Sequence, residues 1–213
     1  MRLRVFLAAA LASLAAAGLA NAQPAAGTAC RSERVSREEL VDFPAAYAAA
    51  EARARAWRAD AVLFKASHTL FAPVDDQGRA PRWNLDFLSP KNREAAEVTI
   101  DKGVLSCGPS SVPAYEPPAL APTFEKDVKR LLAEAAAHGA AAYTARGYTP
   151  RAELRVGSRR WLFRFMLGDP IRHYWYVDYM HPNERKVFRA TFDANDGRFV
   201  GSETYRMGAQ HDD

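Results

Sequence analysis

Apolar side chains recur at helical spacing in two separate parts of the chain. The first stripe consists of Leu40, Phe43, Tyr47, Ala50, Ala54 and Trp57, which lie three or four positions apart. The four residues at 36–39 read Ser-Arg-Glu-Glu, a capping box, so the pattern predicts an amphipathic helix that begins at Ser36. The second stripe, Phe124, Val128, Leu131, Leu132 and Ala135, predicts a helix that Thr123 caps and that ends near His138.

Strand-like alternation of apolar and polar residues follows each of these helices. After the first helix we expect strands over 61–71 and 83–87, and a hairpin over 98–105. After the second we expect strands over 153–156, 160–167, 173–180, 186–192 and 198–205. The turns between these runs are short, whereas parallel pairing requires long crossovers, so the sheets are antiparallel. The predicted fold class is α+β, with two helix-on-antiparallel-sheet units in tandem.

Five prolines within 108–122 separate the two units. Proline lacks a backbone donor, so this segment is predicted to be a linker rather than a helix or a central strand. The expected organisation is therefore a flexible lead over 23–35, a first unit over 36–107, the linker, and a second unit over 123–213.

The first 22 residues have the pattern of a secretory signal peptide. Arg2 and Arg4 precede an apolar run, and Ala20-Asn21-Ala22 supplies the small residues of a cleavage site before Gln23. An uncleaved anchor is the weaker alternative, because a membrane-spanning helix needs roughly 20 apolar residues. A lipid-modified Cys30 also fits less well, because that cysteine comes several residues after the run. We expect a periplasmic or secreted protein with no stable membrane insertion after cleavage.

Removing this segment leaves 191 residues with a formal charge of +2. That near-neutral balance argues against a dedicated nucleic-acid binder, which concentrates cations on one face. The exported part contains two cysteines, Cys30 and Cys107. In an oxidising compartment they are expected to form a disulfide, and their spacing excludes a CxxC redox motif. The Ala- and Arg-rich composition is typical of a GC-rich bacterial genome.

Both halves of the chain resemble PepSY-type modules, which are small exported α+β domains with a cystatin-like helix-on-sheet shape. In the first half the resemblance rests on 48–57, 60–63, the turn at 76–79 and the strand at 83–87. In the second half it rests on 186–200, where this chain has one more turn residue before Gly197 than the family pattern. The resemblance implies two divergent copies that bind or regulate, in some settings by restraining secreted peptidases, rather than catalyse.

The stretch from Arg172 to His181 is the richest in candidate site residues. In a strand, His173, Trp175, Val177, Tyr179 and His181 share one face, and Arg172, Tyr174, Tyr176, Asp178 and Met180 share the other. The simplest interpretation is a core face and a polar or aromatic surface. The functional interpretation is a ligand-binding face, with Tyr174 and Tyr176 as contact area and Arg172 and Asp178 as polar groups. The two histidines are roughly 26 Å apart on one strand, so they cannot share a metal ion.

Other candidate motifs favour structural roles. Asp193 to Gly197 fits a hairpin turn better than a calcium loop, because its Gly arrives one position too early. The alternation of Trp161, Phe163, Phe165 and Leu167 predicts a core face, and His68 and His138 are expected at the surface or at helix ends. The sequence contains no nucleophile elbow, HExxH, phosphate loop or dinucleotide fingerprint, so we predict no catalytic residues, cofactor or metal.

These observations favour a non-enzymatic exported protein that binds a protein or peptide partner in the bacterial envelope. Two alternatives remain open. One is a hydrolase whose site is assembled from scattered residues, and the other is a structural subunit of an envelope complex that recruits its partner through an exposed strand edge.

Overall fold

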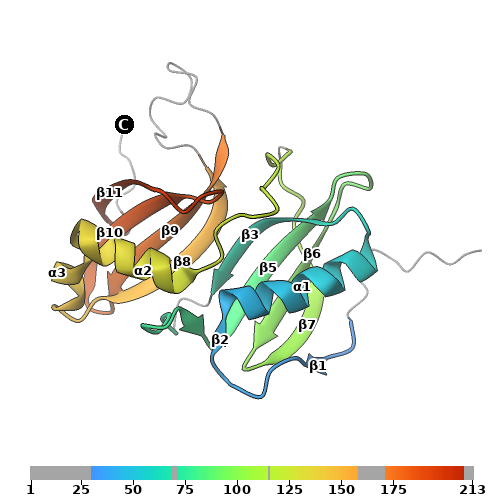
Figure 1. Ribbon diagram of the computed structural model, residues 1–213, viewed down its shortest axis with the longest axis horizontal. Coiled ribbons are helices and arrows are strands. Elements are labelled where there is room, and N and C mark those ends of the chain that lie inside the picture. Colours follow the sequence, from blue (N-terminus) through green and yellow to red (C-terminus); the bar gives the residue numbers. More distant parts are fainter. Residues whose placement is uncertain (1–29, 69–71, 115, 158–170, 209–213) are drawn as a thin grey trace, which may run out of the picture.

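A computed structural model describes residues 30–68, 72–114, 116–157 and 171–208. The fold is α+β, and its centre is a nine-stranded sheet in the order β1-β7-β6-β5-β3-β8-β9-β10-β11 (Figure 1). Every neighbouring pair is antiparallel. The predicted signal peptide and the predicted strand over 160–167 lie outside the described residues. No helix in the described ranges is long and apolar enough to span a membrane.

Helix α1 (Phe43–Trp57) buries a stripe of small residues. Phe43, Ala46, Ala50 and Ala54 face the sheet, and the lack of larger side chains at the three alanines lets the helix approach it closely. The helix starts at Phe43, seven residues after Ser36, and Asp42 is its N-cap: the Asp42 carboxylate accepts a hydrogen bond from the Ala45 amide at 2.7 Å. Pro44 falls in the first turn, where its missing donor costs nothing.

The prediction of a helix start at Ser36 is wrong for a tertiary reason. Val41 is buried in the two-residue strand β2 (Val41–Asp42), which pairs with β4 (Arg79–Ala80). The Val41 carbonyl accepts a hydrogen bond from the Trp83 indole at 2.8 Å, so the chain is extended here. The Ser36 hydroxyl instead accepts from the amide of Glu38, two residues on, in a local turn.

The predicted strands of the first half are present. They are β3 (Val62–His68), β5 (Arg82–Ser89), β6 (Glu94–Asp101) and β7 (Val104–Pro109), with the short β1 (Glu33–Arg34) beside β7. The β6–β7 turn has positive φ at both Lys102 and Gly103, as a two-residue hairpin requires. A Cβ at Gly103 would lie 2.4 Å from the Ser36 carbonyl oxygen, so this glycine also allows the N-terminal segment to approach.

The second half contains α2 (Val128–Ala135) and the strands β8 (Thr149–Gly157), β9 (Arg172–His181), β10 (Glu184–Asp193) and β11 (Phe199–Arg206). The predicted apolar stripe of the helix is buried, but its cap is Asp127 rather than Thr123. Phe124 reaches the core from the turn that precedes the helix, where the Glu125 amide donates to the Ala194 carbonyl. Helical geometry is interrupted at Gly139 (φ 112°) within a π-helical turn (Ala136–Ala140), and α3 (Ala141–Thr144) follows.

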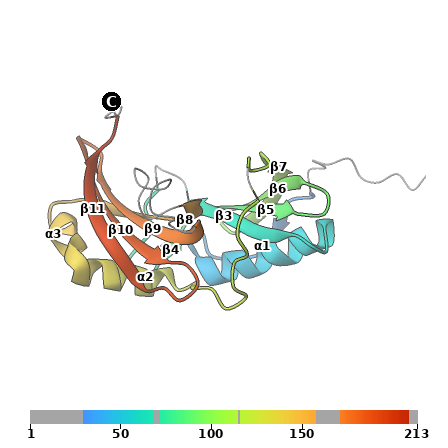
Figure 2. The ribbon, with the colours of Figure 1, turned by 90° about the horizontal axis from the view of Figure 1, so that it is seen from above.

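Strands β3 and β8 join the two halves into one sheet. Lys65, Ala66 and Ser67 pair with Arg155, Leu154 and Glu153. Helices α1 and α2 lie on the same face of this sheet (Figure 2), and the core is continuous beneath them. The Phe43 ring lies 5.1 Å from that of Trp83 in the first half and 4.9 Å from that of Trp175 in the second. The sequence carries no local signal for the pairing of β3 with β8.

The proline-rich segment is held at both ends. Its first two residues, Gly108 and Pro109, still pair with β6. The Ser110 hydroxyl then donates to Asp86 at 2.6 Å, on the face of the sheet turned away from the helices. At the other end, the Ala121 amide donates to the Asn195 side chain at 3.0 Å. The segment is irregular where the structure describes it between 110 and 122, as predicted, and it is anchored to both halves.

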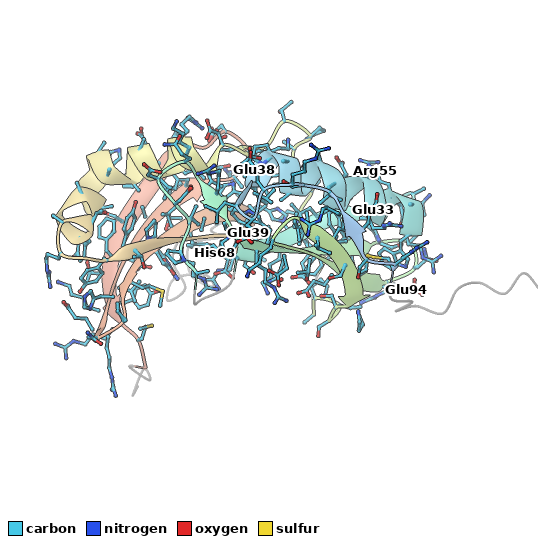
Figure 3. The ribbon with its side chains drawn as sticks, turned by 90° about the horizontal axis from the view of Figure 1, so that it is seen from below. Glu33, Glu38, Glu39, Arg55, His68 and Glu94 are labelled. Carbon is cyan, nitrogen blue, oxygen red and sulfur yellow. A yellow bond between two sulfur atoms is a disulfide. The ribbon has the colours of Figure 1, made fainter. Side chains whose placement is uncertain are left out.

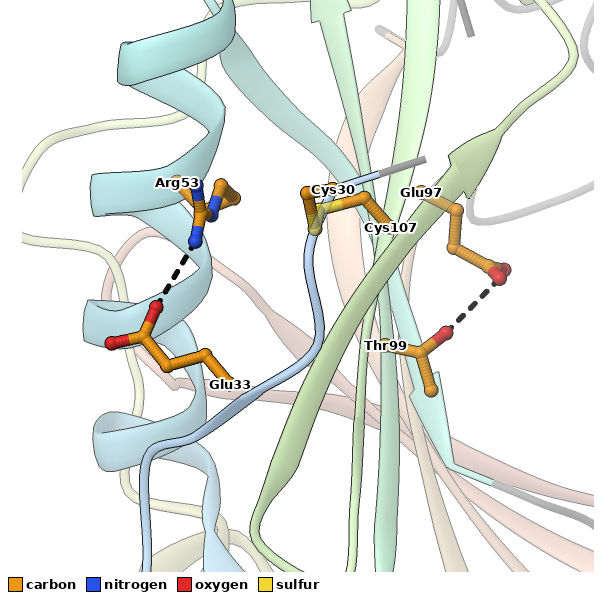
Figure 4. Close-up of a disulfide and its surroundings, with 6 residues drawn as sticks. All are labelled: Cys30, Glu33, Arg53, Glu97, Thr99 and Cys107. Atoms are coloured by element: carbon orange, nitrogen blue, oxygen red, sulfur yellow. Dashed lines mark hydrogen bonds and ion pairs between the residues drawn. A yellow bond between two sulfur atoms is a disulfide. The ribbon is translucent and has the colours of Figure 1, made fainter. Parts of the chain in front are cut away.

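The predicted disulfide between Cys30 and Cys107 is present (Figure 4). It connects the N-terminal segment to β7 over a sequence separation of 77 residues. Glu33, three residues on, forms an ion pair with Arg53 of α1 at 3.0 Å. The N-terminal segment is therefore attached to both the edge of the sheet and the helix. Such a bond is compatible with an exported protein.

Candidate functional site

The face of the sheet opposite the helices, here called the open face, is polar across both halves. One row of paired positions crosses seven strands: Ser106, Thr99, Asn84, Ser67, Glu153, Tyr176 and Thr191. Strand alternation produces this face, because the residues between these positions point into the core. On β5, for example, Trp83 and Leu85 are fully buried on the helix side of Asn84.

The open face over β8 to β11 carries a compact set of side chains that we call the Tyr–Arg cluster. Its members are Glu153, Arg155, Tyr174, Tyr176, Asp178, Arg189 and Tyr205. The Tyr176 ring lies between two guanidinium groups, 4.6 Å from Arg155 and 4.9 Å from Arg189. The Tyr174 ring lies 6.1 Å from that of Tyr176. Cations over tyrosine rings are attracted by the ring quadrupole, so the three stacked groups hold one another in place.

Arg189 is the most constrained member of the cluster. Its Nε and Nη2 donate to the two carboxylate oxygens of Asp178 at 2.7 and 2.8 Å, and Nη2 also donates to the Tyr205 hydroxyl at 2.8 Å. Such a two-point contact fixes the plane of the guanidinium as well as its position. The cluster is therefore a rigid surface.

Burial and charge shift the acid–base behaviour of the cluster. Burial raises the pKa of Tyr176, and the two neighbouring guanidinium groups oppose that rise. Burial, with the Asp178 carboxylate beside it, raises the pKa of Tyr205 to about 12. Burial disfavours the charged form of Arg189, but its hydrogen bonds and ion pair with Asp178 outweigh this and raise its pKa. Tyr176 and Tyr205 are thus neutral at physiological pH, and Arg189 is a permanent cation.

The structure brings together three of the four residues that the sequence singled out. Tyr174, Tyr176 and Asp178 share the open face, but they are 4%, 8% and 5% exposed, so the expectation of exposed aromatics is wrong. The stacked arginines explain the burial of Tyr176, since their stems and planes cover its ring. Arg172 stands apart at the start of β9 and forms an ion pair with Asp193 at 3.4 Å.

Sequence reasoning missed Glu153, Arg155, Arg189 and Tyr205. The first three alternate with core residues on their own strands, which could have placed them on the open face, whereas the neighbours of Tyr205 on β11 are exposed. The register of β8, β10 and β11 against β9 was needed to show that they converge there. Asp178, for instance, is the direct partner of Arg189 on β10 and of Arg151 on β8.

The histidines lie away from this cluster. His68 lies between the two halves of the sheet (Figure 3) and is 2% exposed, so the expectation of a surface or helix-end role is wrong for it. Its Nε2 accepts from the Ala152 amide at 3.0 Å and its Nδ1 lies 2.9 Å from the Ala72 carbonyl oxygen, which specifies a neutral ring protonated at Nδ1. His138 is exposed, as expected, at the kink within Ala136–Ala140, and its ring stacks on that of Phe199 at 3.7 Å.

His173 is a second buried histidine. It is 2% exposed, and burial lowers its pKa to about 4, although its ring also bonds to the backbone of Phe64. The ring is therefore neutral at physiological pH. It points to the helix side of β9 and takes no part in the Tyr–Arg cluster.

The turn at Asp193 to Gly197 is a hairpin turn, as predicted. The Gly197 amide donates to the Asp193 carbonyl at 2.8 Å, and the Asp193 carboxylate accepts from the Asn195 amide at 2.9 Å. That carboxylate therefore caps the turn. Within the described part of the chain, no group of three or more His, Cys, Asp or Glu side chains could hold a metal ion.

Two surface hollows lie in the first half. One, of about 350 Å³, is lined by Leu88, Pro90, Arg93, Val112, Pro113, Ala114 and Glu116. The other, of about 620 Å³, is lined by Ser32, Arg34, Arg37, Glu39, Asp101, Lys102, Val104 and Ser106. Neither includes a residue of the Tyr–Arg cluster.

Comparison with family models, with curated proteins and with solved structures finds no match for this chain. Its function is therefore inferred from its own residues, and the Tyr–Arg cluster on the open face is the candidate site.

Proposed function

We propose that this protein is an exported, non-enzymatic binding or regulatory protein of the bacterial envelope. It recognises a protein or peptide partner through the open face of β8 to β11. The observation that carries the proposal is the stacking of Tyr176 between Arg155 and Arg189, with Arg189 fixed by Asp178. Tyrosine and arginine dominate binding energy at interfaces, and a preorganised surface loses little side-chain entropy when a partner binds.

Two further features support the proposal. The order of a helix followed by antiparallel strands in each half fits two divergent copies of a PepSY-like unit, and such modules bind or regulate. The signal-peptide pattern and the Cys30–Cys107 bond support export. If the chain is exported as proposed, the intact mass of the periplasmic or secreted protein gives an N-terminus at Gln23. Retention of Met1, or a lipid-modified Cys30, would contradict cleavage at that site.

Site-specific photo-crosslinking tests the binding face. A photoreactive residue replaces Glu203 or Arg172 on the open-face side, or Glu51 on α1 as the matched control. In the producing cells, the first two positions should yield adducts with the same partner, and Glu51 should yield none. Adducts formed only from Glu51 would show that the partner docks on the helix side and would refute the proposal.

Substitution of the tyrosines complements this test. Tyr174→Ala and Tyr176→Ala are measured for stability beside partner capture, and Tyr176→Phe keeps the stacked ring without the hydroxyl. Capture lost in Tyr176→Ala but retained in Tyr176→Phe, at a temperature where both are folded, supports the binding role. If capture falls only in proportion to the unfolded fraction, the cluster is structural and the binding site lies elsewhere.

A further inference from the structure

Strand β8 presents three charged side chains in a row on the open face. They are Arg151, Glu153 and Arg155, and they share this face because the alternate residues Ala152 and Leu154 are fully buried in the core. At about 3.3 Å per residue, the two arginines are about 13 Å apart along the strand, with the glutamate midway. The strand thus offers a cation, an anion and a second cation in sequence.

The two arginines are incompletely paired. Three buried side-chain nitrogen or oxygen atoms among the described residues lack a hydrogen-bond partner, and two of them are Nε of Arg151 and Nε of Arg155. In the described ranges Arg151 has no ion pair either. Arg155 and four other cations on this face each have a carboxylate within ion-pair distance, so Arg151 differs from all of them; the four are Lys65, Arg82, Arg172 and Arg189. Both Nε atoms are buried, but the terminal nitrogens of the two guanidinium groups are not among these buried atoms, so they remain available to an acidic ligand.

The neighbouring carboxylates cannot complete the pairing. Asp178 lies opposite Arg151 in register, but both of its oxygens accept from Arg189, and the Tyr205 hydroxyl is 3.3 Å from one of them. Glu153 reaches Arg155 only at 3.7 Å. Among the described residues, no carboxylate other than Glu153 lies within ion-pair distance of either guanidinium group, so both can pair with acidic groups of a ligand.

We infer that β8 binds an extended peptide segment whose charges complement its own. The segment carries acidic side chains at its first and fifth positions and a basic side chain at its third, which faces Glu153. An extended chain places its first and fifth side chains about 13 Å apart on one side, matching the arginines, whereas a helix places them about 6 Å apart. This inference rests on the proposed function and names the chemistry of the segment through which the partner docks.

Three blocked seven-residue peptides test the inference against the full mature chain with its disulfide intact. All three peptides carry Ser or Thr at the remaining positions. One carries Glu, Lys and Glu at positions two, four and six, one carries the reversed charges, and one carries Gln at all three. At low salt the Glu-Lys-Glu peptide should bind about tenfold more tightly than its charge-reversed twin, with the Gln peptide between them. The preference should shrink in 0.5 M salt, because exposed ion pairs are screened.

Substitutions on β8 supply the decisive comparison. Arg151→Gln and Arg155→Gln should each weaken binding of the Glu-Lys-Glu peptide about threefold, the size expected for a partly exposed ion pair. Arg55→Gln on α1 is the matched control and should leave binding unchanged. The double variant Arg151→Glu/Arg155→Glu, checked for folding by circular dichroism, should reverse the preference between the two charged peptides. Should it misfold, the Gln variants alone decide.

The inference is overturned if the two charged peptides bind equally well, or if the folded double Glu variant keeps the wild-type preference. The proposed function can fail separately, because it depends on the crosslinking result. A partner crosslinked at Glu203 whose contacting segment lacks the acidic-basic-acidic pattern would refute this inference and leave the proposed function standing. If the double Glu variant reverses the peptide preference but no open-face adducts form in cells, binding of the peptide to β8 is supported and the proposed function is refuted.

Discussion

The two halves of the sheet have the same layout, but different side chains fill their open faces. On β3, β5 and β6 several are short, as in Ser67, Asn84, Asp86 and Thr99, and the last three form side-chain hydrogen bonds. On β9 to β11 they are large and stacked, as in Tyr174, Tyr176, Arg189 and Tyr205. The helix sides are alike, each with an apolar helix over aromatic strand residues. The comparison teaches that both halves bury the same kind of core on the helix side, and that they differ on the open face.

The halves also differ in how they are stabilised. The first half has the longer helix and the disulfide, which ties its outer edge to the N-terminal segment. The second half has an eight-residue α2 and no disulfide, and its open face is held by the buried Asp178–Arg189 pair. Covalent and electrostatic constraints therefore serve different halves, and each can be removed separately.

The largest expected effect comes from Phe43, whose ring touches both halves of the core. Phe43→Ala should cost about 4 kcal/mol in the free energy of unfolding, because a fully buried aromatic ring is lost and a cavity remains. Chemical denaturation should still show one cooperative transition. Two separate transitions would mean that the halves fold independently in spite of the shared sheet. The partly buried Phe199 on β11 is the control, and its replacement by Ala should cost clearly less.

Removing the disulfide should weaken the first half selectively. The double variant Cys30→Ser/Cys107→Ser should lose about 4 kcal/mol in the chain-entropy model for a loop of 77 residues. Hydrogen exchange should accelerate first in β1 and β7, with β9 and β10 affected only through global unfolding. Two free thiols in the exported wild-type protein would refute the bond itself.

The buried ion pair should matter more than its counterpart in the first half. Asp178→Asn should cost about 3 kcal/mol, because Arg189 is left buried with an uncompensated charge. Asp86→Asn, on the equivalent face of β5, should cost less than about 1 kcal/mol. Its partner Lys65 is 44% exposed at 3.7 Å, and the amide oxygen can still accept from Ser110. Equal losses in urea denaturation would remove the electrostatic distinction between the halves.

The smallest effect is a pH dependence that His173 introduces into the second half. Its pKa of about 4 in the folded protein lies below the ordinary value of 6.5, so the unfolded chain binds the proton more readily. The stability it contributes is present above pH 6.5 and is lost as the pH falls towards 4. Between pH 7 and pH 5 the loss should be about 2 kcal/mol. Denaturation at both pH values should show this loss of stability in the wild type and not in His173→Gln. Identical pH profiles of the two proteins would contradict the assignment of the loss to His173.

The sequence by itself determined the parts that depend on neighbours along the chain. Alternation and turn residues predicted the strand over 83–87, the 98–105 hairpin and the last three strands. The α+β class and antiparallel pairing follow, because short turns allow no other connection. Two cysteines in a chain with a signal-peptide pattern sufficed to predict the disulfide. The buried stripe of α2 was likewise visible, since helical spacing is a local property.

Tertiary structure alone decided where the helices begin and how the halves meet. The predicted helix starts at Ser36 and Thr123 were overruled because Val41 is buried in the strand β2 and Phe124 is buried ahead of the Asp127 cap. The β3–β8 pairing joins segments about ninety residues apart. Each of these strands is the last of its own half, and backbone hydrogen bonds between them leave no pattern in the sequence. The candidate site has the same origin. Alternation could place Tyr176 and Arg189 on a strand face, but only the register across β8 to β11 stacks one against the other, because cross-strand contacts depend on alignment and not on sequence spacing.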